Sequence, residues 1–584
     1  HIHSLLTLKK YAVRHRFAIV ISFTLVLLSN SMMLIGPMIL KYVVDDLNQG
    51  RDQITREKIL RYALLILGVA LVGGLFRFGQ RSLIGSVARR IEYELRGDFF
   101  KHLQKMQKSY FEQVNTGDLM SRATNDLDAV HRLLGFAIIY IADATVFFGF
   151  ALVIMLRIDV TLTILALIPY PILAVLVQFI SKSLHNNFER IQEGFSKMNT
   201  KVQENLSGVR VVRAYTLEQS EIEEFDRQNL NFVNLNRVFI GLEAIFFPIF
   251  RLLPGIGAIV LLWLGGLHVI QGKIMLGDFV AFNAYLAMLI RPVIMLGFIV
   301  NRFAQGTASI DRINLILNQK PEICDEEGVD EKITELNGEI EFRHLTFAYS
   351  DSSPVLKDIN FKIDAGSTVA IVGATGAGKT TLVGLIPRIY QPERGSVFID
   401  GTDIRDIPLE TLRTSIGMVQ QESFLFSDLL KNNIAYGADS ATETEIEVAA
   451  HNADLLSQID EFPNRFDTHV GERGKTLSGG QKQRTAIARA IMTPPKILIL
   501  DDAFANVDTH TEDTILDRLK QVGSDCTTIL ISHRISTVKA ADQIVVLHDG
   551  RIVETGTHQD LVSQNGIYAN IQQKQLLKEE IELL

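Results

Sequence analysis

Long apolar runs dominate the first 310 residues of this 584-residue chain, whereas the remainder alternates between short apolar strands, turns and helices. A membrane-spanning helix needs about 20 apolar residues, because the hydrocarbon layer is about 30 Å thick and a helix rises about 1.5 Å per residue. Runs of that length lie at about residues 17–40, 59–79, 135–156, 160–180, 245–270 and 275–300. The pattern predicts a domain of six transmembrane helices.

Basic residues between these runs predict which side each connection faces. Ten Lys and Arg lie between Arg77 and Arg132 and eight between Lys182 and Arg237, against one each near Arg157 and Lys273. Since cytosolic connections carry the excess of Lys and Arg, both long segments are predicted to be cytosolic. The segment from Lys41 to Arg61 carries five, which we attribute to helix ends at the interface.

The two cytosolic segments keep a helical pattern without clusters of Pro or Gly. We therefore expect helices of around 50 residues, about 75 Å long, that extend beyond the bilayer. Their tips are predicted near Phe111 to Asp126 and near Ser207 to Glu218. The alternative is a short bundle with large disordered cytosolic loops.

Several polar residues lie inside the predicted spans, where they usually face protein or water. Asp143 and Arg291 are each roughly 21 to 24 Å from the outer ends of their helices, at about 1.5 Å per residue. They either pair or separately face a wet cavity, and Asn30 and Glu243 are further candidate cavity residues. The four prolines inside the spans are interpreted as tolerated kinks: Pro37, Pro248, Pro254 and Pro292.

The change of pattern near residue 340 predicts a second domain of the α/β class. We place the transmembrane domain at 1–318, a linker at 319–337, the α/β domain at 338–574 and a tail at 575–584. A net charge of −8 gives no indication of nucleic-acid binding. The two cysteines, Cys324 and Cys526, are far apart, which argues against a disulfide framework or a metal cluster. No cleavable signal peptide is visible.

A phosphate-binding loop follows the predicted strand Thr368 to Val372. Residues 373–380 read Gly-Ala-Thr-Gly-Ala-Gly-Lys-Thr and fit the pattern G-x-x-x-x-G-K-[ST]. Glycines let backbone N–H groups surround the phosphates of ATP, the lysine neutralises the β and γ oxygens, and the hydroxyl ligates Mg²⁺. The predicted ATP-binding residues here are Gly373, Thr375, Gly376, Ala377, Gly378, Lys379, Thr380 and Thr381, with Thr380 also a metal ligand.

A second apolar strand, Lys496 to Asp501, ends in two carboxylates. Ligands of parallel sheets collect at the carboxyl ends of the strands. Asp501 is therefore predicted to hold Mg²⁺ through water, and Asp502 to orient or deprotonate the water that attacks ATP.

With these motifs in place, nearly the whole chain resembles an ABC exporter half-transporter, a six-helix transmembrane domain followed by an ABC ATPase domain. The resemblance implies that Tyr349 stacks on adenine, that Gln421 contacts Mg²⁺ and senses the membrane domain, and that His533 contacts the γ-phosphate. Residues 468–474 resemble the segment that contacts cytosolic helix tips, and 506–508 fall at the D-loop. The family signature spans 477–481, and its members Ser478, Gly479, Gly480 and Gln481 would bind the ATP held by a second chain.

This chain departs from the family at Asp502, where active members carry Glu. Asp is one methylene shorter, and a shift of about 1 Å can cost on the order of 10²-fold in rate. The resemblance then implies the degenerate subunit of a heterodimer, whose partner supplies the Glu. A homodimer in which Asp502 suffices is the alternative.

The expected function is ATP-driven export from a cytoplasmic membrane, with the ATPase domain in the cytosol. A cavity lined by Phe, Met, Leu and Ile with few charges favours hydrophobic or amphipathic cargo, including drugs, lipids or peptides. An ATP-gated channel or a regulatory membrane subunit is a second reading. Six spans argue against a soluble ABC ATPase of DNA repair or translation, and the fused domains argue against an importer. A peptide-processing exporter is disfavoured because no protease domain precedes the elbow-like segment 5–16.

Overall fold

The computed structural model describes residues 6–48, 55–326, 328–349, 353–438, 440–522 and 525–582. The chain divides into two compact units, each described by itself below. The first comprises His1–Gln104 and Asn115–Gln319, and the second comprises Lys105–Val114 and Lys320–Leu584. The short segment 105–114 thus groups with the second unit although it lies within the first half of the sequence.

The first unit is entirely helical in its described part. Its helices are α1 (Leu6–Arg14), α2 (Arg16–Asn48), α3 (Arg56–Leu103), α5 (Thr116–Ser121), α6 (Leu127–Arg132), α7 (Ile138–Ile158), α8 (Val160–Leu167), α9 (Pro169–Ser207), α10 (Val209–Ala214), α11 (Glu218–Val260), α12 (Gly266–Ile270) and α13 (Leu276–Leu317). Three π-helical turns at Arg122–Asp126, Leu133–Ala137 and Leu261–Gly265 join neighbouring helices without a break. The helices α2, α11 and α13 continue through their internal prolines.

Within the part of the chain that the structure describes, five helical stretches are long and apolar enough to cross a membrane: Arg16–Asn48, Arg56–Leu103, Thr116–Ile158, Val160–Ser207 and Leu276–Met295. They contain the predicted runs 17–40, 59–79, 135–156 and 160–180 and most of 275–300. For the run 245–270, the apolar helix within the described residues is the shorter stretch Pro254–Ile270. Several side chains between 246 and 253 lie outside the described set.

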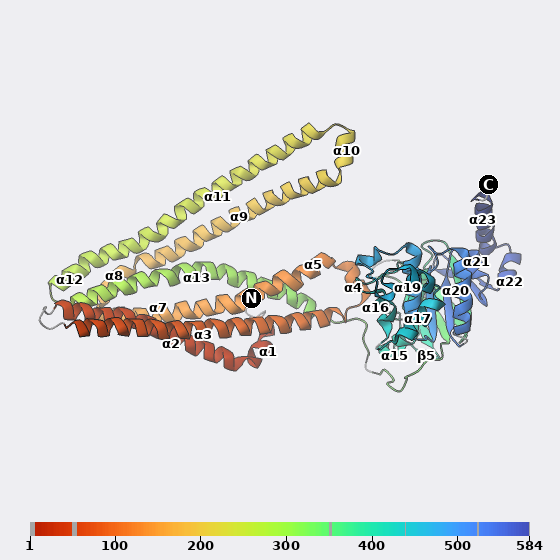
Figure 1. Cartoon of the computed structure of the whole chain (residues 1–584), viewed down its shortest axis with the longest axis horizontal. Coiled ribbons are helices and arrows are strands. Elements are labelled where there is room, and N and C mark those ends of the chain that lie inside the picture. The colour runs from red at the N-terminus through yellow and green to blue at the C-terminus, as the bar shows by residue number, and fades with distance from the viewer. Residues whose placement is uncertain are drawn as a thin grey trace. The chain divides into compact units, whose positions relative to one another are not determined.

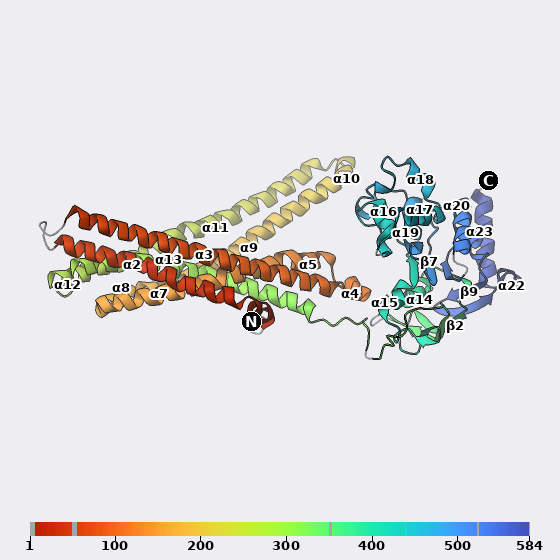
Figure 2. The same ribbon diagram turned by 60° about the horizontal axis from the view of Figure 1, so that its bottom comes forward.

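The long helices expected from the sequence are present. The helix α3 has 48 residues, or about 72 Å at about 1.5 Å per residue, and ends at Leu103, a few residues before the expected position. The helices α9 and α11 lie side by side and are joined through α10, and this hairpin diverges from the bundle of α2, α3, α7 and α13 in both views (Figures 1 and 2). Its tip, between Ser207 and Glu218, lies where the sequence predicts it.

Buried polar contacts hold the bundle in register. Two tyrosines donate hydrogen bonds to backbone carbonyl oxygens of other helices: Tyr285 to Leu34 at 2.9 Å and Tyr170 to Leu286 at 2.7 Å. Burial raises the cost of leaving such hydroxyls unpaired. These bonds fix α13 against α2, and α9 against α13.

The elbow-like segment predicted at 5–16 forms α1, which packs on the far end of α3. The Tyr11 hydroxyl is buried and donates to Asp98 at 2.7 Å, and Arg14 pairs with Glu94 at 2.6 Å. The first helix is therefore held by specific side-chain contacts to a helix about 80 residues later in sequence.

The second unit contains two sheets. The antiparallel sheet has the order β2-β1-β4-β5, and the six-stranded sheet has the order β10-β9-β3-β8-β7-β6 with parallel pairing from β9 to β6. The strands are β1 (Ile340–Phe347), β2 (Leu356–Ile363), β3 (Thr368–Gly373), β4 (Val397–Ile399), β5 (Thr402–Asp403), β6 (Ile416–Val419), β7 (Ile497–Asp501), β8 (Thr527–Ile531), β9 (Gln543–His548) and β10 (Arg551–Gly556).

Helices cover the six-stranded sheet, and the helices α16 to α19 form a separate lobe (Figures 1 and 2). The helices of the unit are α4 (Lys108–Gln113), α14 (Lys379–Leu385), α15 (Leu409–Thr414), α16 (Leu430–Ile434), α17 (Glu443–Asn452), α18 (Leu456–Glu461), α19 (Gly479–Ile491), α20 (Thr509–Val522), α21 (Ile535–Val538), α22 (His558–Ser563) and α23 (Ile567–Glu582). One apolar core lies between the two sheets and another between the parallel sheet and the helical lobe. Cys324 and Cys526 are free thiols.

Close packing of α13 against the π-helical turn at Leu133 gives a stability test. A Cβ added at Gly306 would lie 2.6 Å from the Leu133 Cβ, whereas one added at Gly149 on α7 meets nothing within 4 Å. Overpacking costs about 1 to 3 kcal/mol, so Gly306→Ala should lower the thermal unfolding midpoint in detergent by several degrees. Gly149→Ala is the control and should leave the midpoint unchanged or raise it. Equal midpoints for the two variants would contradict this packing.

Candidate nucleotide site and membrane cavity

The phosphate-binding loop lies at the carboxyl end of β3, between two parallel neighbours. A Cβ at Gly373 would meet the Leu547 carbonyl oxygen of β9 at 2.2 Å, so only glycine fits there. Gly378 has a φ of +100° and its added Cβ would lie 2.8 Å from Leu356. The remaining predicted loop residues, Thr375, Gly376 and Ala377, lie between these two positions, and Thr380 and Thr381 begin α14.

Lys379 is buried at the start of α14 and folds back over the loop. Its ammonium group donates to the carbonyl oxygens of Gly373 and Ala374, each at 2.9 Å. Burial lowers the pKa of Lys379, and the charges of Asp501 and Asp502 oppose that shift. The lysine is therefore a preformed positive charge that can exchange two carbonyl contacts for phosphate oxygens.

Asp501 ends the adjacent strand β7 and is almost completely buried. Burial raises the pKa of its carboxyl group, and its Oδ2 atom accepts no hydrogen bond from any described residue. A buried carboxylate oxygen without a donor, close to a threonine hydroxyl, matches the oxygen ligands that Mg²⁺ prefers. Gln421 follows the end of β6, the strand that pairs with β7, and its side chain is exposed.

Asp502 turns away from the strand in a left-handed conformation, with a φ of +50°. Its N–H donates to the Ile531 carbonyl oxygen at the end of β8, at 2.9 Å, which fixes this turn. His533 is exposed two residues beyond the same strand. The ends of β7 and β8 thus bring both predicted catalytic residues to one edge of the sheet.

Tyr349, the predicted adenine-stacking residue, reaches the phosphate-loop helix. Its hydroxyl shares a hydrogen bond with the Thr381 hydroxyl at 2.7 Å, and its ring meets Tyr390 edge to face with centroids 5.0 Å apart. Burial raises the pKa of Tyr349. The Tyr349 side chain therefore connects the predicted adenine-stacking position with the start of α14.

Tyr390 extends this connection to α4, and sequence reasoning missed it. The Tyr390 hydroxyl donates to Glu112 at 2.8 Å, and the Lys108 ammonium lies 5.3 Å from the centre of the Tyr390 ring. Burial and the Glu112 carboxylate both raise the pKa of Tyr390. The sequence signal was the Lys-x-x-x-Glu spacing in a short helix, which is too common to indicate such a contact.

The signature residues form the beginning of α19. Ser478 caps the helix: its hydroxyl accepts from the Gln481 N–H at 3.3 Å, while the Gln481 amide oxygen accepts from the Ser478 N–H at 2.9 Å. A Cβ at Gly480 would lie 2.9 Å from the Asn506 carbonyl oxygen, and one at Gly479 would lie 3.2 Å from the Asn506 side chain. A side chain at Gly480 would displace the D-loop backbone, and one at Gly479 would make a tight contact with the Asn506 side chain, because the D-loop lies directly against the signature.

Arg534, the residue that follows His533, is hydrogen-bonded to the D-loop. Its guanidinium donates to the Val507 carbonyl oxygen at 2.6 Å and to the Glu512 carboxylate at 2.7 Å, and Glu512 is completely buried. Thr537 also donates to Glu512. We find here a positioning network that the motif analysis did not single out.

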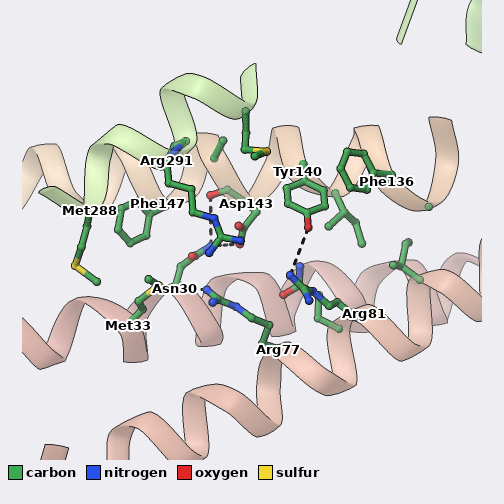
Figure 3. A pocket seen from close by; sticks show the side chains of 17 residues that line it. Asn30, Met33, Arg77, Arg81, Phe136, Tyr140, Asp143, Phe147, Met288 and Arg291 are labelled. Atoms are coloured by element: carbon green, nitrogen blue, oxygen red, sulfur yellow. Dashed lines mark hydrogen bonds between the residues drawn. The ribbon is translucent and has the colours of Figure 1, made fainter. Parts of the chain in front are cut away.

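A separate cavity of about 300 Å³ lies among α2, α3, α7 and α13 of the helical unit (Figure 3). Asn30, Asp143 and Arg291 line it together with Arg77 and Arg81, whereas Glu243 does not. Among the described residues Asp143 and Arg291 make no ion pair, and Asp143 instead accepts a hydrogen bond from Asn30 at 2.9 Å. The sequence left two alternatives for Asp143 and Arg291, an ion pair or separate positions in a cavity, and the structure shows the second. Pro292 also lines the cavity. The cavity contains several charged side chains, whereas the sequence predicted a lining with few charges.

Comparisons with known proteins agree with this architecture. The family model of the ABC transporter transmembrane region matches residues 19–293, and that of the ABC transporter matches residues 356–505. A probable multidrug resistance ABC transporter ATP-binding/permease protein of Bacillus subtilis is 37% identical over 573 residues, which cover 97% of this chain and 96% of the relative. The chain belongs to the ABC transporter family.

Two further comparisons identify the exporter type. An ATP-dependent lipid A-core flippase of Syntrophus aciditrophicus is 37% identical over 544 residues, which cover 93% of this chain and 90% of the flippase. A bacterial Atm1-family ABC exporter with ATP bound superposes with a TM-score of 0.80 at 29% identity, over 96% of this chain and 99% of that one. This ABC transporter is an exporter half-transporter: a multi-pass membrane domain fused to an ABC ATPase domain. Such exporters bind and hydrolyse ATP and work as dimers in a bilayer.

The Arg534 network predicts a selective loss of turnover. Arg534→Met removes the guanidinium that joins Val507 and Glu512, so the D-loop and His533 lose their fixed spacing. We expect the ATPase activity of this chain, expressed and purified without a partner chain, to fall about tenfold, in line with the loss of charge-assisted hydrogen bonds, while affinity for a fluorescent ATP analogue stays within about twofold.

Arg518→Met serves as the control. Arg518 lies on α20 and pairs with Asp454 at 3.0 Å, a contact that is separate from the Arg534 network. An equal loss of ATPase activity in both variants, or a parallel loss of nucleotide affinity, would show that Arg534 supports only folding.

Proposed function

We propose that this chain is one subunit of a heterodimeric ABC exporter that moves hydrophobic or amphipathic compounds out across the cytoplasmic membrane. Its own ATPase site is weak, and a different half-transporter chain supplies the efficient one. The observation that carries this proposal is Asp502, a shortened carboxylate at the catalytic position of an otherwise complete set of motifs.

In this proposal the residues have the following roles. Lys379 and the loop from Gly373 to Thr381 hold the phosphates, and Tyr349 stacks on the adenine. Thr380, Gln421 and Asp501 hold Mg²⁺, which neutralises charge on the β and γ oxygens when bound. Asp502 and His533 act on the attacking water and the γ-phosphate, while Ser478, Gly479, Gly480 and Gln481 complete the partner's site.

ATP binding drives the conformational change because only the closed dimer contacts both faces of each nucleotide. The tips of the long helices transmit closure to the membrane domain, which then changes from inward-facing to outward-facing. Tyr349, Tyr390 and Glu112 offer one route for this coupling within the ATPase unit, since their contacts run from the phosphate-loop helix to α4. Hydrolysis, mainly at the partner's site, resets the transporter.

The cargo class rests on the relatives and on the cavity. One relative is named a probable multidrug resistance ABC transporter and another an ATP-dependent lipid A-core flippase, and a lipid is a molecule with a large apolar part. A cavity of about 300 Å³ among membrane helices falls within the size range of small-molecule sites.

Restoring the missing methylene tests the weak site. Asp502→Glu should raise ATP hydrolysis at this chain's site about tenfold or more, because a shift of about 1 Å of a catalytic group can cost on the order of 10²-fold. The measurement is ATPase activity of this chain expressed without a partner chain and reconstituted in proteoliposomes, where no second type of site contributes. Asp513→Glu, at an exposed position on α20, is the matched control and should change nothing.

Affinity purification from native membranes tests the partner. We expect a second half-transporter of similar size with Glu at the position equivalent to Asp502. Full turnover by this chain alone as a homodimer would reject the heterodimer.

A further inference from the structure

Among the described residues, the side chains that line the membrane cavity carry an excess of positive charge. Arg77 and Arg81 enter it from α3 and Arg291 enters it from α13, opposite one carboxylate, Asp143 (Figure 3). Ionisable groups at membrane depth are costly and usually face a ligand path or a partner. The formal charge of the lining, +2, therefore calls for a counter-charge.

The guanidinium groups retain most of their hydrogen-bonding capacity. Each guanidinium has five N–H donors. In the described part of the chain, Arg77 contacts the Met33 sulfur at 3.2 Å and Arg81 contacts the Tyr140 hydroxyl at 3.4 Å. Both contacts are weak, and neither involves an anion. The arginines thus remain available to a carboxylate, sulfonate or phosphate, which guanidinium binds in a bidentate manner.

Asn30 provides a second, independent observation. It is 1% exposed, its amide nitrogen donates to Asp143, and its Oδ1 atom is buried without a hydrogen-bond partner in the described structure. Because Asp143 accepts from the amide nitrogen, the orientation of the amide is fixed and the oxygen is left over. A buried acceptor of this kind is suited to a hydroxyl or amide N–H of a bound molecule.

The other side chains around these polar groups are apolar. Phe136 from the π-helical turn Leu133–Ala137, Phe147 from α7, and Met288 and Met295 from α13 line the same cavity. Aromatic rings and the flexible thioethers of Met accommodate apolar bodies of varied shape. The lining therefore combines an anion-binding side with an apolar side.

We propose that this cavity binds amphipathic molecules that carry a negatively charged group, with Arg77, Arg81 and Arg291 holding the anion and Asn30 accepting a hydrogen bond from the same molecule. This inference rests on the proposed export function and names the chemical class of its cargo. Cationic amphiphiles, by contrast, would meet three positive groups and one carboxylate that already accepts from Asn30.

A matched pair of ligands tests the charge preference. A radiolabelled alkylnaphthalene sulfonate and its uncharged sulfonamide share one apolar body. Binding is measured by scintillation proximity to the full-length transporter in phosphatidylcholine nanodiscs without nucleotide. We expect the sulfonate to bind about tenfold tighter, and Arg81→Gln and Arg291→Gln each to weaken the sulfonate, not the sulfonamide, about tenfold.

Arg90→Gln is the control, since Arg90 is an exposed arginine of the same helix α3 outside the cavity lining. Asp143→Asn should leave sulfonate binding unchanged or tighten it. Equal affinities for the two ligands, an equal loss in the Arg90 variant, or tighter binding of the corresponding naphthalene methylammonium that is lost in Asp143→Asn would each overturn the proposal. The thermal unfolding midpoint of every variant, compared with that of the unchanged protein, verifies that it is folded.

Anionic lipid and soluble anions share this chemistry, and the bilayer composition separates them. Displacement of the sulfonate when nanodiscs contain phosphatidylglycerol assigns the site to a lipid headgroup, and persistence of binding assigns it to a soluble anion; both results support an anion site. ATP-driven accumulation of either ligand in inside-out vesicles tests export itself. Charge-selective binding without such accumulation rejects export but retains the anion site, whereas accumulation without charge preference rejects only the anion site.

Discussion

The parallel pairing of β3 between β8 and β9 is the constraint on which the nucleotide site depends. In that register Gly373 lies beside Leu547, and in the adjoining pair Asp501 lies beside Ile531, so the phosphate loop and the acidic strand end reach the same edge. The pairing leaves no room for a side chain at Gly373. It also buries Lys379 and Asp501 in the same small region, which lowers the pKa of the lysine and raises that of the carboxylic acid. The resulting charges are poorly solvated and ready to exchange protein contacts for phosphate and metal.

From that edge, two sets of contacts lead outward through the ATPase unit. On one side, the Asp502 N–H binds Ile531, and Arg534 ties the following segment to the D-loop, which itself packs on the signature glycines. On the other side, the Tyr349 and Tyr390 rings connect the phosphate-loop helix with Glu112 on α4. Both routes are made of hydrogen bonds and packing contacts between specific residues, so a displacement at one end of a route is expected to change contacts at its other end. The residue at the start of each route, Tyr349 or Asp502, is one that the motifs alone identify.

The sequence was sufficient where a physical pattern is local. Apolar length predicted the membrane helices, unbroken periodicity predicted the long cytosolic extensions, and the loop spacing predicted that Gly373 to Thr381 follow a buried strand. It was insufficient where function depends on which helix faces meet. Arg77 and Arg81 lie at the end of an apolar run, and the sequence analysis counted them in the basic segment predicted to be cytosolic. They instead line a cavity because α2, α7 and α13 surround that side of α3. In the same way, the grouping of 105–114 with the ATPase unit depends on Tyr390, which is nearly 280 residues away from Glu112.

The placement of the cavity has a consequence for how cargo is handled. Its charged residues belong to α3, α7 and α13, which pack in one bundle with α2, while α9 and α11 form the diverging hairpin (Figures 1 and 2). In the proposed binding mode, a ligand held by these arginines contacts helices of this bundle. In a low-dielectric cavity the attraction between guanidinium and an anion is strong, and admission of water weakens it several-fold. Opening the cavity to the outer aqueous side is thus sufficient to lower the affinity for a charged cargo, without any movement of the arginines that bind it.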